Sequence, residues 1–186
     1  MQKRTFGILG EISALTLGGG GIGEVWGPTS REEAVATVRE AVEAGITFVD
    51  VAPGYGNGEA ELVIGEAFGG RLPDGVGVST KCAVGSPAPG DILPLLEASL
   101  DESLARMKLD TVDLFFLHSR IVPDDAVDRR RGTPRGLLIE AVRPAFERLV
   151  ERGRIGAWGI SGIGVPSAGQ PGHATLSPPP TIVASP

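Results

Sequence analysis

The chain has 186 residues, a formal net charge of −6 and 41% hydrophobic residues. The acidic charge disfavours nucleic acid as a partner, because binding to a phosphate backbone needs a cationic surface. One cysteine and two histidines exclude an intramolecular disulfide and the usual four-ligand zinc site, so we expect no metal. No apolar run approaches the roughly 20 residues that cross a bilayer, and no signal-peptide pattern is present. We therefore expect a cytoplasmic protein that does not bind membranes.

The predicted elements alternate between strands and helices. An apolar strand at 15–17 runs into a glycine-rich loop, and Ser30 and Glu33 form a capping box that predicts a helix ending at Gly45. The alternation continues with strands at 46–50, 76–81, 112–118 and 155–161 and helices at 57–68, 91–106 and 138–151. This order predicts a parallel sheet with right-handed crossovers and hence an α/β fold. A (β/α) barrel and an open doubly wound sheet both fit the pattern.

The last part of the sequence differs from the rest. Residues 164–186 contain six prolines, three glycines and no Asp, Glu, Lys or Arg. Such a composition cannot bury enough apolar surface to offset the entropy cost of folding. We therefore expect one domain at 1–163, followed by an uncharged, disordered tail at 164–186.

Four ionisable residues lie at or just after the ends of three predicted strands: Asp50, Tyr55, Lys81 and His118. The carboxyl ends of parallel strands share one edge of a sheet, so we expect these side chains to meet. A free phenol, with a pKa of about 10, is a weak proton donor at neutral pH, but a nearby Lys81 would stabilise the phenolate of Tyr55. Asp50 would pair with the ammonium, which is costly to bury alone. A neutral His118 would orient a substrate oxygen by a hydrogen bond.

A glycine-rich segment at 18–23 offers an alternative, because it formally matches the G-x-G-x-x-G of dinucleotide-binding folds. In those folds the glycine turn opens directly into a helix whose free amides meet the pyrophosphate. Here the helix cap is Ser30, and the helix opens with Glu32 and Glu33, whose charges would repel a phosphate. We therefore favour a wide loop over an open-sheet dehydrogenase. Within that loop we interpret Trp26 as a substrate-binding residue.

These residues occur in four motifs that resemble the aldo-keto reductase family. The run from Asp50 to Gly65 is similar to the family signature with the catalytic Asp and Tyr. Ser79-Thr80-Lys81 and Leu117-His118 match the motifs of its catalytic Lys and His. Gly159-Ile160-Ser161 is similar to the Gly-x-Ser-Asn that holds the nicotinamide carboxamide. The four motifs occur in the family's order and spacing.

The resemblance covers about residues 14–163 and implies a (β/α)8 TIM barrel. It also implies NADPH as the hydride donor, with NADH as the alternative, and small aldehydes, ketones or sugar carbonyls as substrates. By the same likeness, Asp50, Tyr55, Lys81 and His118 are catalytic and Ser161 binds the cofactor. Gly162 stands where the family usually has Asn, so one carboxamide contact is missing from the motif.

The likeness ends after the fifth strand, whereas a complete barrel needs at least about 200 residues. We therefore expect an incomplete barrel with about five of eight strands, a truncated chain, and weak or absent oxidoreductase activity. Five units would leave the first and fifth strands with unpaired edges, through which copies of the chain would associate. The alternative function is a non-catalytic pseudoenzyme or interaction module that uses those edges.

Overall fold

The computed structural model describes residues 1–126 and 132–161, so the predicted tail lies outside the described residues. Its centre is a five-stranded parallel sheet. In spatial order the strands are β3 (Leu17–Gly18), β4 (Phe48–Asp50), β5 (Gly77–Cys82), β6 (Val112–Leu117) and β9 (Ile155–Ile160). Spatial order therefore follows chain order, as in a barrel, whereas a doubly wound sheet reverses its order at a switch point. The predicted α/β fold with five barrel strands is confirmed.

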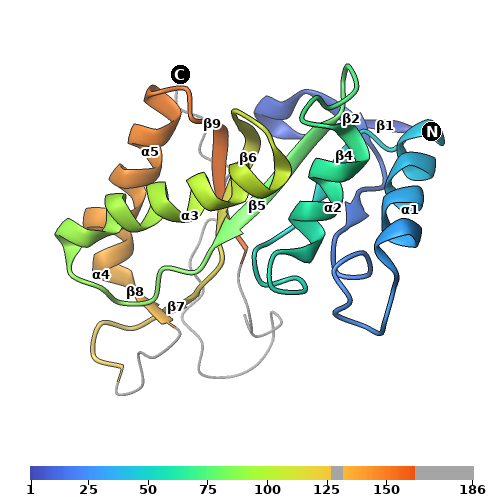
Figure 1. Cartoon of the computed structure of the whole chain (residues 1–186). Coiled ribbons are helices and arrows are strands. Elements are labelled where there is room, and N and C mark those ends of the chain that lie inside the picture. The colour runs from blue at the N-terminus through green and yellow to red at the C-terminus, as the bar shows by residue number, and fades with distance from the viewer. Residues whose placement is uncertain (127–131, 162–186) are drawn as a thin grey trace, which may run out of the picture.

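Four helices cover one face of this sheet (Figure 1): α1 (Arg31–Glu43), α2 (Glu59–Phe68), α3 (Ile92–Met107) and α5 (Arg143–Glu151). The core between the helices and the sheet is apolar and buried, with Val38, Ile64, Leu96, Phe115 and Leu149 among its members. Within the described ranges, no helix has both the length and the apolar character needed to span a bilayer.

The helix predicted at 138–151 begins three residues earlier, at Arg135, and the helical segment has three parts. A short α4 (Arg135–Leu137) leads into a π-helical turn at Leu138–Val142, and α5 follows. Pro144 is the second residue of α5 and has no amide hydrogen to donate to the carbonyl four residues earlier, which lies in the wide turn. A widened turn at this place accommodates the missing hydrogen bond.

Several short elements were not predicted. Strands β1 (Lys3–Thr5) and β2 (Glu11–Ser13) form an antiparallel hairpin around the 3-10 turn η1 (Gly7–Leu9). Leu9 and Ile12 of this hairpin pack against a second small cluster on the sheet, formed by Phe48, Leu114 and Ala157. The hairpin strands are largely exposed, so they lack the apolar alternation that would have revealed them. The others are η2 (Pro89–Asp91), β7 (Arg120–Val122) and β8 (Gly132–Pro134).

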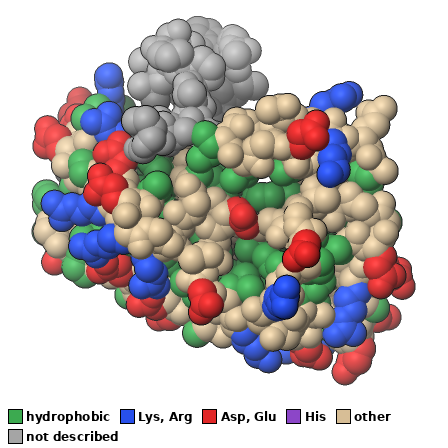
Figure 2. All heavy atoms as spheres, turned by 90° about the horizontal axis from the view of Figure 1, so that it is seen from above, with side chains coloured by type: hydrophobic (Ala, Val, Ile, Leu, Met, Phe, Trp, Pro, Cys, Tyr) green, Lys and Arg blue, Asp and Glu red, His purple; other side chains and the backbone are tan. Residues whose placement is uncertain are grey.

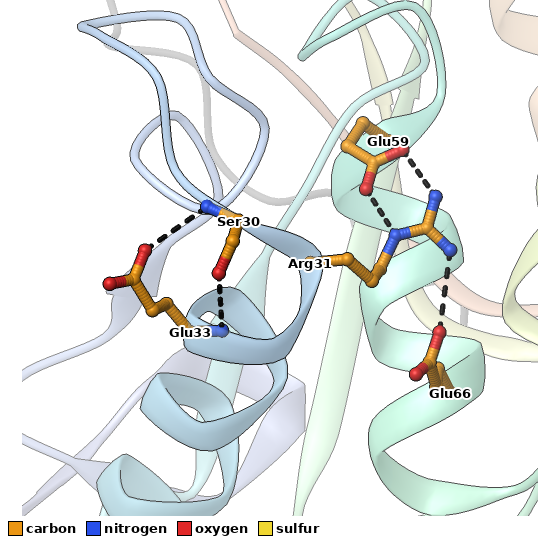
Figure 3. A network of polar contacts seen from close by, with 5 residues as sticks. All are labelled: Ser30, Arg31, Glu33, Glu59 and Glu66. Carbon is orange, nitrogen blue, oxygen red and sulfur yellow. Dashed lines mark hydrogen bonds and ion pairs between the residues drawn. The ribbon is translucent and has the colours of Figure 1, made fainter.

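The start of α1 is fixed as the sequence predicts (Figure 3). The Ser30 hydroxyl accepts a hydrogen bond from the Glu33 amide at 3.2 Å, and the Glu33 carboxylate accepts one from the Ser30 amide at 3.1 Å. These two bonds confirm the capping box. Next to the cap, Arg31 donates to Glu59 and Glu66 of α2. The pair with Glu66 is exposed and the pair with Glu59 is partly buried. Surface pairs of this kind contribute about 0–1 kcal/mol each.

Candidate active site

The predicted site residues come to one edge of the sheet because the backbone ladder continues past each strand end. The His118 amide donates to the Cys82 carbonyl at 2.8 Å, and the Ser161 amide donates to the Leu117 carbonyl at 2.9 Å. On the other side, the Gly19 amide donates to the Asp50 carbonyl at 2.7 Å. Asp50, Lys81, His118 and Ser161 therefore lie at the carboxyl ends of neighbouring parallel strands, where α/β folds place their chemistry.

Lys81 is buried, with 3% of its surface exposed, and its ammonium is fully paired. Its Nζ donates to both carboxylate oxygens of Asp50 and to the carbonyl of Val51, each at 2.8 Å. These three acceptors match the three hydrogens of an ammonium. The ammonium is thus held in one position at the edge of the sheet.

Tyr55 lies on the loop between β4 and α2, next to this ion pair. Its ring centroid is 4.7 Å from Lys81 Nζ, so the ammonium faces the ring in a cation–π contact. The turn after Tyr55 uses three consecutive left-handed residues, Gly56, Asn57 and Gly58, with φ of 65°, 54° and 93°. Glycine adopts this conformation without strain and asparagine tolerates it, which explains the local sequence.

The glycine-rich segment lets a second loop approach the loop of Tyr55. A Cβ on Gly23 would lie 2.8 Å from the carbonyl oxygen of Tyr55. A Cβ on Gly56 would lie 2.4 Å from the carbonyl oxygen of Gly23. Both distances are too short for any side chain, so close backbone contact accounts for these glycines. Trp26 lies on the same loop, 80% exposed, with its ring against Gly20.

A pocket of about 410 Å³ opens beside the ion pair. Asp50, Lys81 and Ser161 line it, whereas Tyr55 and His118 are not among its lining residues, nor is Trp26. Seen from above, hydrophobic side chains gather in a hollow near the middle of the molecule (Figure 2). The larger apolar residues of the pocket lining are Phe6, Ile12, Phe48, Leu114, Phe116 and Ile160.

One polar partner in the site has no predicted role. The Ser79 hydroxyl donates to Asp50 Oδ1 at 2.5 Å and so helps to orient the carboxylate that holds Lys81. Ser79 lies two residues before Lys81, and side chains two apart on a strand share a face. That spacing places Ser79 on the same face as Lys81, but the bond to Asp50 depends on how the two strands pair.

His118 is half-buried at the same edge. Burial lowers the pKa of its imidazole, the positive charge of Lys81 lowers it further, and the carboxylate of Asp50 partly opposes both effects. The ordinary pKa of a histidine is about 6.5. The imidazole is therefore neutral at pH 7, the form that has one donor and one acceptor nitrogen.

This lowered pKa predicts a pH dependence of stability. Below about pH 6.5 the unfolded chain binds a proton at His118 that the folded chain resists, so the free energy of unfolding falls as the pH falls. We expect the urea midpoint to decrease between pH 7.5 and pH 5.5, and to decrease less in His118→Gln. Chemical denaturation followed by circular dichroism measures both. An identical decrease in the variant and the wild type would contradict the expectation.

The sequence matches a family model described as the Aldo/keto reductase family over residues 14–173. L-galactose dehydrogenase of Arabidopsis thaliana is 32% identical over 167 residues, covering 88% of this chain and 49% of that protein. Methylglyoxal reductase YeaE of Escherichia coli (strain K12) is 29% identical over 165 residues, covering 88% of this chain and 51% of that protein. The chain thus spans about half the length of these curated relatives.

Solved structures agree with the sequence matches. An aldo-keto reductase from Klebsiella pneumoniae in complex with NADPH superposes with a TM-score of 0.66 at 29% identity, covering 88% of this chain and 51% of that one. The glycerol dehydrogenase from Gluconobacter oxydans gives a TM-score of 0.64 at 26% identity, covering 87% of this chain and 48% of that one. The family model and the backbone match both extend over most of this chain, including the five-stranded sheet. The chain therefore belongs to the aldo/keto reductase family.

Proposed function

We propose that this chain carries the proton-donating part of an NADPH-dependent carbonyl reductase, with Tyr55 as the general acid. One observation supports the proposal above the others. Lys81 Nζ is bonded to the Asp50 carboxylate at 2.8 Å and lies 4.7 Å from the Tyr55 ring centroid. The Tyr55 phenol is next to the Lys81 ammonium, which is held by the Asp50 carboxylate, and this arrangement is suited to proton donation by the phenol.

The chemistry of each group follows from its contacts. Reduction of a carbonyl develops negative charge on the oxygen, and Tyr55 would donate its phenolic proton there. The ammonium of Lys81 would stabilise the phenolate that remains, because it lies 4.7 Å from the centroid of the ring over which that charge is shared. Asp50 keeps the ammonium in place and offsets the cost of its burial.

The residues near the pocket fit the nicotinamide end of the cofactor. Ser161 lines the pocket at the end of β9 and offers a hydroxyl that can donate to and accept from a carboxamide. Phe116 and Ile160 provide an apolar wall beside it. When bound, NADPH supplies the hydride. The Klebsiella pneumoniae relative crystallised with NADPH has the same fold over 88% of this chain.

His118 would orient the substrate. Its lowered pKa keeps the imidazole neutral, so one ring nitrogen can donate a hydrogen bond to the carbonyl oxygen while Tyr55 supplies the proton. We propose small aldehydes, ketones or sugar carbonyls as the substrate class, because Tyr55 and His118 act on the carbonyl oxygen alone.

The direct test measures NADPH consumption by the full 186-residue chain with a small aldehyde. We expect slow reduction, visible at enzyme concentrations comparable to NADPH, with one alcohol formed per NADPH consumed. NADPH binding is measured separately by the change in its fluorescence. Bound NADPH without any alcohol formed, or no NADPH binding at any concentration, would overturn the proposal.

A further inference from the structure

A second buried charge lies on the opposite side of β5 from the active-site lysine. Glu61, in the first turn of α2, is fully buried, and both of its carboxylate oxygens are paired. Thr80 Oγ1 donates to its Oε1 at 2.6 Å, and Arg106 Nε of α3 donates to its Oε2 at 2.6 Å. The proposed chemistry uses none of these three residues.

Stability alone does not account for a buried ion pair at this position. The Glu61 side chain is fully buried and that of Arg106 is 24% exposed. Desolvation of the carboxylate offsets much of its attraction to Arg106, and well-packed apolar side chains would stabilise such a junction equally well. A carboxylate with two directional hydrogen bonds does something that an apolar contact does not, because it fixes the distance and angle between the elements that it joins. Here the joined elements are α2, β5 and α3.

Two short connections link this junction to the active site. Thr80 directly precedes Lys81, and the alternation of a strand turns their side chains to opposite faces of the sheet. At the other end, the amide of Ala60, the neighbour of Glu61, donates to the Tyr55 carbonyl at 3.2 Å. The contacts thus form a closed ring. Tyr55 is bonded to α2 through Ala60, Glu61 of α2 is bonded to Thr80, and the neighbour of Thr80, Lys81, contacts the Tyr55 ring.

Arg106 tightens the same junction. Besides pairing with Glu61, its side chain lies over Gly58, where a Cβ would be 2.8 Å from Arg106 Cδ. Gly58 is the residue directly before α2. Arg106 therefore restrains the end of the loop that carries Tyr55.

We propose that Glu61 is a positioning residue, which acts through Thr80 and through the first turn of α2 to set the spacing between the Tyr55 phenol and the Lys81 ammonium. The proposal rests on the proposed function for its catalytic meaning. Its geometric content can be tested without any turnover.

The test uses the fact that the chain contains a single tyrosine. With ring-¹³C-labelled tyrosine the full chain gives the NMR signals of Tyr55 alone, and their chemical shift depends on the ammonium near the ring. We expect Thr80→Val, which removes the hydroxyl at nearly constant volume, to displace these signals. Thr80→Ser keeps the hydroxyl and should return them to the wild-type position.

Two further variants separate positioning from general destabilisation. Glu61→Gln keeps the acceptor for Thr80 but sets an amide against Arg106, and it should displace the Tyr55 signals as well. Leu149→Ala removes buried volume from α5 and should lower the melting temperature while leaving the signals in place. Unchanged Tyr55 signals in folded Thr80→Val would overturn the proposal, as would an equal displacement in Leu149→Ala.

The same variants distinguish this proposal from the proposed function. If the chain reduces aldehydes, we expect Thr80→Val to lower kcat at least threefold while the KM for NADPH changes less than twofold, with recovery in Thr80→Ser. Failure of the aldehyde assay together with displaced Tyr55 signals would refute the function and support the positioning role. Aldehyde reduction together with unchanged Tyr55 signals in Thr80→Val would support the function and refute the positioning role.

Discussion

Asp50→Asn should destabilise the fold by about 3–5 kcal/mol, a large part of the 5–15 kcal/mol that holds a typical domain together. The asparagine has nearly the shape of the aspartate, so little packing is lost. It removes the negative charge that pairs with Lys81, however, so an ammonium that is 3% exposed would keep only neutral acceptors, the Val51 carbonyl and one amide oxygen. Urea denaturation followed by circular dichroism gives the free energy of unfolding directly.

Asp101→Asn is the matched control. Asp101 pairs with Arg154 at the surface, and its side chain is 60% exposed, so the same chemical change should cost about 0–1 kcal/mol. A double variant with Lys81→Met should lose less stability than the two single variants added together, because it leaves no unpaired charge. Equal losses in Asp50→Asn and Asp101→Asn would show that the Lys81 ammonium is well solvated, contrary to the structure.

Tyr55→Phe should lower the rate of carbonyl reduction by about 10²- to 10⁴-fold, the usual contribution of a general acid. Phenylalanine keeps the half-buried ring and its face toward Lys81, so the fold and the cation–π contact should persist. Only the donated proton is lost. The measurement is the single-turnover rate of NADPH consumption with a small aldehyde.

Two controls make this result specific to proton donation. NADPH affinity, followed by fluorescence, should be nearly the same in Tyr55→Phe and wild type, because Ser161 and the pocket residues are unchanged. The thermal unfolding curve should also be close to that of the wild type. A rate within threefold of the wild-type rate would remove Tyr55 from its role as the acid.

Local signals in the sequence were sufficient for much of the architecture. The capping box of Ser30 and Glu33 gave the start of α1 at its observed position. The apolar residues of helix α2, by contrast, do not fall on one side of the helix. The structure explains this: Glu61 is buried within it, while Leu62 is 37% exposed. A carboxylate on the buried face violates the helical pattern, and its two partners come from β5 and α3.

Ser79 and the β1–β2 hairpin show what a sequence pattern does not reveal. The hairpin strands are short and polar, and they are held by contacts of Leu9 and Ile12 with the sheet rather than by their own propensity. The role of Ser79 depends on where the Asp50 carboxylate lies, which the parallel pairing of β4 and β5 determines.

The sequence alone determined the order of the five sheet strands and of the four helices that cover them, and its motifs identified Asp50, Tyr55, Lys81 and His118 as candidates at or just after strand ends. The strands and helices depend on propensity, capping and period, which act over a few neighbouring residues, whereas the candidate residues rest on the order and spacing of their motifs. The three acceptors of the Lys81 ammonium, its contact with the Tyr55 ring and the burial of Glu61 were decided by the tertiary structure. Partners and desolvation arise only when segments distant in the chain pack together, and these two factors set the energy of a buried charge.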